Sequence, residues 1–89
     1  MLIIEEITKA HKTNGNYNFF LHFNTGERVK VQKRGDSSGE LPKCVGLVTK
    51  ARLNARQYII VLETSEFSYQ FMETEELVEI LKKHSLLDV

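Results

Sequence analysis

The side chains most able to bind a ligand are the basic residues in the middle of the chain and one aromatic residue near them. Residues 28–57 carry eight basic and two acidic side chains, a net charge of +6, although the whole chain is formally neutral. Residues 1–27 carry −1 and residues 58–89 carry −5. Clustered cations neutralise phosphates, and an aromatic ring among them offers a surface on which a base can stack. The candidate nucleic-acid-binding residues are therefore Phe20, His22, Arg28, Lys30, Lys33, Arg34, Lys50, Arg52 and Arg56.

Catalytic signatures are absent from the sequence. It contains no glycine-rich phosphate loop, no dinucleotide-binding fingerprint and no zinc-protease motif. Cys44 could act as a nucleophile only if His11 or His22 approached it, because a thiolate needs a base or a positive field. A small buried residue is the simpler interpretation of this single cysteine, which also excludes an intramolecular disulfide. We therefore expect a protein that is not an enzyme and that uses no cofactor and no metal.

The distribution of apolar residues bears on localisation. Glu5 and Glu6 interrupt the apolar N-terminal run, and no basic segment precedes it, so no secretion signal is expected. The longest uncharged apolar stretch, residues 58–62, is far shorter than the roughly 20 residues that a membrane helix needs. We expect a soluble, cytoplasmic protein without a membrane partner.

Alternating apolar and polar residues predict a series of strands. Residues 17–23 alternate most clearly, and the turn signal at residues 13–16 favours a strand over a helix for residues 2–11. A three-residue turn with Gly26 in a left-handed conformation joins residues 17–23 to a strand at 27–33. This turn places the apolar pairs opposite each other and keeps one face of the hairpin continuous. The predicted pairs are Leu21 with Val29, Phe19 with Val31, His22 with Arg28, Phe20 with Lys30, and Asn18 with Gln32.

The second half of the chain continues with strands and ends in a helix. Residues 34–43 are rich in glycine and serine and predict a mobile surface loop. A strand is expected over residues 44–53, with a short helix over 41–52 as an open alternative. Its predicted sides are Val45, Leu47, Ala51 and Leu53 on one, and Val48, Lys50 and Arg52 on the other. Residues 57–63 read as a central, buried strand and residues 67–72 as the last strand.

The C-terminal helix has clear boundaries. Thr74 is a good N-cap, Glu75 and Glu76 fit the positive first turn, and basic residues fit the last turn. One apolar face follows the helical spacing, and the leucines after the helix are expected to fold back over its end. This face consists of Leu77, Ile80, Leu81 and His84, followed by Leu86 and Leu87.

These elements predict a single α+β domain over residues 1–89: a mostly antiparallel bent sheet or small barrel of five to six strands with one C-terminal amphipathic helix. Two functions stay open. The first is a small binding module that engages nucleic acid through Arg28 to Arg56. The second is a protein-interaction or regulatory subunit, including a homodimer, that uses the acidic helix or an exposed strand edge. The first would fail if Phe20 lay beneath the helix or if the helix glutamates matched the cations.

Overall fold

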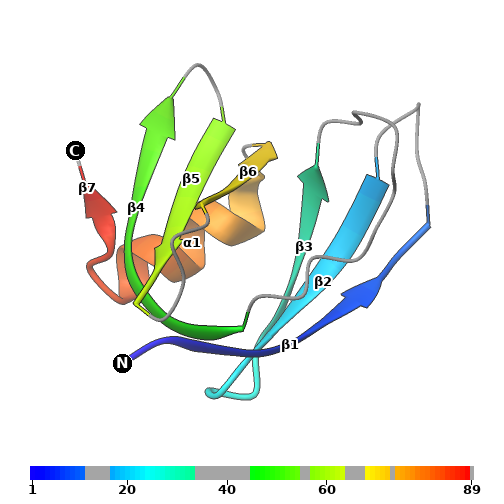
Figure 1. The fold of residues 1–89 in the computed structure, drawn as a ribbon, viewed down its shortest axis with the longest axis horizontal. Coiled ribbons are helices and arrows are strands. Elements are labelled where there is room, and N and C mark those ends of the chain that lie inside the picture. The colour runs from blue at the N-terminus through cyan, green and yellow to red at the C-terminus, as the bar shows by residue number, and fades with distance from the viewer. Residues whose placement is uncertain (12–16, 34–44, 55–56, 64–67, 73, 89) are drawn as a thin grey trace.

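The computed structural model describes residues 1–11, 17–33, 45–54, 57–63, 68–72 and 74–88 (Figure 1). Within these ranges one sheet and one helix form the fold. The elements are β1 (Ile3–Lys9), β2 (Tyr17–Phe23), β3 (Arg28–Lys33), β4 (Gly46–Asn54), β5 (Gln57–Leu62), β6 (Ser68–Met72), α1 (Glu75–Lys83) and β7 (Leu87–Asp88). The structure thus confirms the predicted α+β class, a strand within residues 2–11, a strand in the described part of 44–53, and the terminal helix.

The strands form one bent sheet in the order β1-β2-β3-β6-β5-β4-β7. Neighbours are antiparallel, except that β7 runs parallel to β4. Among the described residues, β3 meets β6 at the pair Gln32–Met72, and β1 also meets β4 at two pairs that involve Ile3 and Ile4. The sheet bends back on itself and is not closed. Figure 1 shows β2 and β3 on one side of the molecule and β4 and β7 on the other, with β1 running along the bottom of the view from one side to the other.

The β2–β3 hairpin has the predicted register at every pair. Leu21 lies opposite Val29, and Phe20 lies opposite Lys30. Gly26 has φ +88°, and its N–H donates to the carbonyl of Phe23 at 3.0 Å. An L-residue with a side chain rarely adopts this conformation, so the glycine allows the tight turn that sets the register.

The predicted sides of β4 are wrong. Val48 is buried together with Ala51, whereas Val45 and Leu53 are 44% and 50% exposed. The register against β5 shifts between Val48 and Lys50. Such a bulge adds one residue to one strand, so the alternation of faces is broken and residues three apart can both point into the core.

Both ends of α1 are capped. Thr74 is the N-cap, and its hydroxyl accepts a hydrogen bond from the Leu77 amide. After the helix Ser85 has φ +56°, and the Leu86 amide donates to the Leu81 carbonyl at 2.9 Å, the arrangement of a Schellman cap. The reversal returns the chain to β4, where the Ala51 amide donates to the Leu86 carbonyl at 2.8 Å. Leu86 and Leu87 therefore fold back as predicted. Leu87 also begins β7, a strand that the sequence did not predict.

The hydrophobic core lies between the concave face of the sheet and α1. The helix contributes Leu77, Ile80 and Leu81, which are at most 3% exposed. The hairpin contributes Phe19 and Leu21 to the same cluster. Side chains that alternate with these two on β2 must therefore point away from the core.

Candidate nucleic-acid interface

The candidate interface is the outer face of β1, β2 and β3. On β2, the neighbours of Phe20 and of His22 along the chain have side chains buried on the core face. Because side chains alternate along a strand, Phe20 and His22 both point outward. The β1–β2 and β2–β3 registers build two rows across three strands. These rows are Thr8–Phe20–Lys30 and Glu6–His22–Arg28.

Phe20 forms the centre of this face. Its side chain is half-buried, and the Arg28 guanidinium carbon lies 4.4 Å from the centre of its ring. This is a cation–π contact, and it orients the long arginine side chain across the sheet. Phe20 is not part of the core cluster that includes the buried face of α1. The alternative in which Phe20 lies beneath the helix is therefore wrong.

His22 is fixed by a neighbour on β1. Its Nε2 lies 2.8 Å from the hydroxyl oxygen of Thr8, so the two side chains share a hydrogen bond across the strands. In the same row Glu6 flanks His22 on β1, and Arg28 flanks it on β3. The acidic Glu6 marks the end of the cationic part of the face.

A hollow of about 380 Å³ lies beside Phe20 at the other end of the face. Its lining combines that ring with Lys30 and with the end of β1, namely Lys9, Ala10 and His11. Sequence reasoning missed the β1 residues, because the register of β1 against β2 was not assigned. The turn signal at residues 13–16 predicted the hairpin, and its register places Thr8 opposite Phe20.

The start of α1 docks on the backbone of β3. The Lys30 amide donates to Oε2 of Glu76 at 3.3 Å, and the Lys30 carbonyl accepts from Oγ1 of Thr74 at 3.4 Å. Both contacts use the lysine backbone. Among the described residues, no carboxylate lies within ion-pair distance of the side-chain cations of Lys9, Arg28 or Lys30. The helix glutamates therefore lie next to the cations without forming ion pairs with them.

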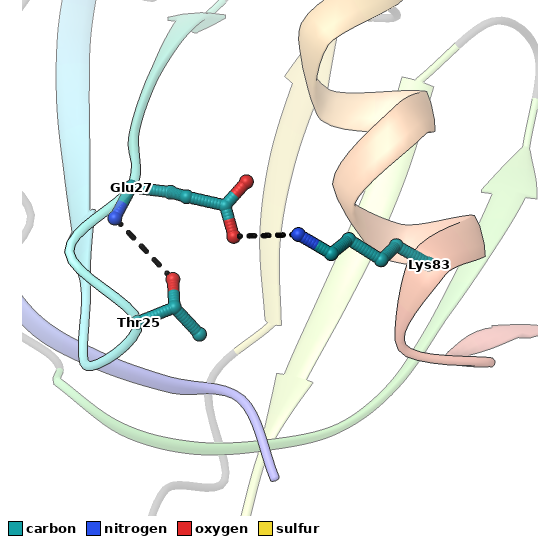
Figure 2. Close-up of polar contacts among 3 residues, drawn as sticks. All are labelled: Thr25, Glu27 and Lys83. Carbon is teal, nitrogen blue, oxygen red and sulfur yellow. Dashed lines mark hydrogen bonds and ion pairs between the residues drawn. The ribbon is translucent and has the colours of Figure 1, made fainter.

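A second hollow, of about 440 Å³, separates α1 from the start of β3. Three carboxylates line it, those of Glu27, Glu76 and Glu79, together with Arg28 and Lys83. Nζ of Lys83 lies 3.5 Å from Oε1 of Glu27, and the Glu27 amide donates to Oγ1 of Thr25 at 3.3 Å (Figure 2). These side chains are 66% and 41% exposed, so the ion pair contributes little to stability. The carboxylates that line this hollow form the border of the cationic face on the side of α1.

Among the other predicted residues, Lys50 and Arg52 are the two whose side chains are described. Lys50 and Arg52 are exposed on β4, which β6 and β5 separate from β3 in one direction and β2 and β1 in the other. Lys33 ends β3 opposite Tyr17, and only its backbone is described. Arg34 and Arg56 lie outside the described residues, as do Cys44 and the loop predicted at 34–43.

Comparison with known proteins yields no match to a protein-family model, to a curated protein or to a solved structure. No helix in the described ranges is long and apolar enough to cross a bilayer. A search of the same residues for clusters of three or more histidine, cysteine, aspartate or glutamate side chains that could hold a metal ion finds none.

Proposed function

We propose that this protein is a small binding module that engages nucleic acid through the outer face of β1, β2 and β3. The observation that supports the proposal is the position of three cations near Phe20: Arg28 lies over its ring, Lys30 lies opposite it on β3, and Lys9 lines the hollow beside it. Lys9, Arg28 and Lys30 come from two strands, are all exposed, and form no ion pair with a described carboxylate. Unpaired cations beside a half-buried ring provide both phosphate contacts and a stacking surface.

Affinity on this face comes mainly from counterion release. Each phosphate that a lysine or arginine neutralises contributes about 0.7 to the slope of log K against log salt for a single strand, and about 0.9 for a duplex. Three cations therefore predict a slope of roughly −2 to −3. Binding is tight only at low ionic strength, because screening weakens each contact.

The test is filter binding of single- and double-stranded DNA and RNA over a range of salt concentrations. Lys9→Gln and Lys30→Gln should each weaken binding and reduce the slope by about 0.7 to 0.9. Lys50→Gln and Arg52→Gln remove the same charge from β4 and serve as matched controls. Absence of binding by the wild type at low salt ends the proposal, and an equal loss in the β4 variants places the interface elsewhere.

A homodimer is a second candidate, supported by the position of α1 beside β3. The acidic side of the helix, with Glu76 and Glu79, borders the face that carries Arg28 and Lys30. Adjacent acidic and basic strips are self-complementary when a two-fold rotation turns one copy onto another. Sedimentation at low and high salt tests this candidate, which predicts dimers that dissociate as salt is added. A monomer at high concentration and low salt contradicts it.

A further inference from the structure

We infer that the hollow beside Phe20 receives one unpaired nucleotide, with its base against the ring and its phosphate between Lys9 and Lys30, so that the protein prefers single strands to duplexes. This inference rests on the proposed function. It adds the form of nucleic acid and the place of one base.

The position of Arg28 leaves part of the Phe20 ring available. The guanidinium lies over the ring at 4.4 Å, yet Arg28 does not line the hollow that Phe20 lines. Arg28 therefore does not border the space that the hollow leaves beside Phe20. A base in the hollow would stack on Phe20 without displacing the arginine, and every base has a π-face that can do so.

The charges that line the hollow beside Phe20 and the hollow between α1 and β3 favour an anion in the hollow beside Phe20. Lys9 and Lys30 line the hollow beside Phe20, and none of the described residues that line it is acidic. The hollow between α1 and β3 is lined by Glu27, Glu76 and Glu79. A phosphate is attracted to the first site and repelled by the carboxylates of the second.

The size of the hollow favours a single nucleotide. About 380 Å³ is near the lower end of the range of about 300–1,000 Å³ that is common for ligand pockets. In a duplex the bases are paired and stacked inside, and a base must be taken out of the stack before it can reach an aromatic side chain. A single strand does not have this cost, so its base can stack on the Phe20 ring, whereas a duplex can contact only the cations through its phosphates.

The decisive comparison is among three ligands of equal length: a twelve-residue thymidine strand, its duplex with the complementary strand, and a twelve-unit abasic deoxyribose-phosphate strand. The abasic strand keeps the phosphates and lacks the bases. We expect it to bind about 5- to 150-fold more weakly than the thymidine strand, which corresponds to the value of one base–aromatic stack. The slope against salt should stay the same, because the phosphates are unchanged. A uridine strand of the same length distinguishes RNA from DNA.

The protein variants complete the test. Phe20→Leu should lower affinity for the thymidine strand by a similar factor and leave affinity for the abasic strand unchanged, and Phe20→Tyr should restore thymidine binding. Because the ligand comparison uses the wild-type protein, it decides the matter even if Phe20→Leu fails to fold.

The outcomes separate this inference from the proposed function. Equal, salt-dependent affinity for all three ligands overturns the inference and leaves the proposed function standing. An equal loss of thymidine and abasic binding in Phe20→Leu also overturns it. Failure of every ligand to bind ends both.

Discussion

Replacing Thr74 by alanine removes the hydroxyl that connects α1 to the strand carrying Arg28 and Lys30. This oxygen accepts a hydrogen bond from the Leu77 amide at 3.3 Å and donates one to the Lys30 carbonyl at 3.4 Å. Loss of a threonine N-cap costs about 1 kcal/mol, within a range of about 0.5–2. The second bond is long and exposed and contributes at most about 0.5 kcal/mol. We therefore expect Thr74→Ala to lower the free energy of unfolding by about 1–2 kcal/mol.

Urea denaturation followed by circular dichroism measures this loss, with Thr74→Ser as the matched control. Serine keeps the hydroxyl and should remain within about 0.5 kcal/mol of the wild type. Amide exchange adds a local readout: the Lys30 amide, which is bonded to Glu76, should exchange faster in Thr74→Ala because the helix start is no longer held on β3. Equal stability of Thr74→Ala and the wild type, or an equal loss in Thr74→Ser, would refute the reasoning.

Three other substitutions have defined outcomes. Ser85→Gly should stabilise the protein by about 0.5–1 kcal/mol in urea denaturation, because the residue has φ +56° and glycine adopts this conformation without strain, whereas Ser85→Ala should bring no gain. Asn24→Ala should destabilise it by about 1–2 kcal/mol, because the side chain accepts from the Ile3 amide at 2.8 Å and donates to the Met1 carbonyl at 3.2 Å. Glu79→Gln should strengthen nucleic-acid binding about two- to fourfold at low salt, since it removes a carboxylate beside Arg28, and Glu79→Asp should not; an effect that persists in 1 M salt would contradict an electrostatic origin.

Features that depend on neighbouring residues could be predicted from the sequence. The turn at Gly26 determines the β2–β3 register, because only a three-residue turn keeps Leu21 opposite Val29. The N-cap at Thr74 determines where α1 begins, and the spacing of its apolar residues determines which side is buried. For the same reason the sequence placed Phe20, His22, Arg28 and Lys30 on one face of the hairpin, where the structure also has them.

Features that depend on distant partners could not be predicted in this way. The bulge between Val48 and Lys50 arises in the pairing with β5, and no turn residue marks it in the chain. The two residues of β7 form a strand only because β4 offers a free edge beside Ala51. The same limit applies to the site: Lys9 and His11 join it through the β1–β2 pairing, and Lys50 and Arg52 lie on β4, which does not pair with β2 or β3.

The arrangement of the strands also changes how the charge pattern is interpreted. In the sequence a basic middle and an acidic end are separate blocks. The docking of α1 on β3 instead brings Glu76 and Glu79 beside Arg28, while β4 carries two of the cations to another part of the molecule. A surface formed by the seven predicted lysines and arginines would give a single-strand salt slope of about −5, whereas Lys9, Arg28 and Lys30 give about −2. The measured slope therefore reports whether the chain order or the fold defines the interface.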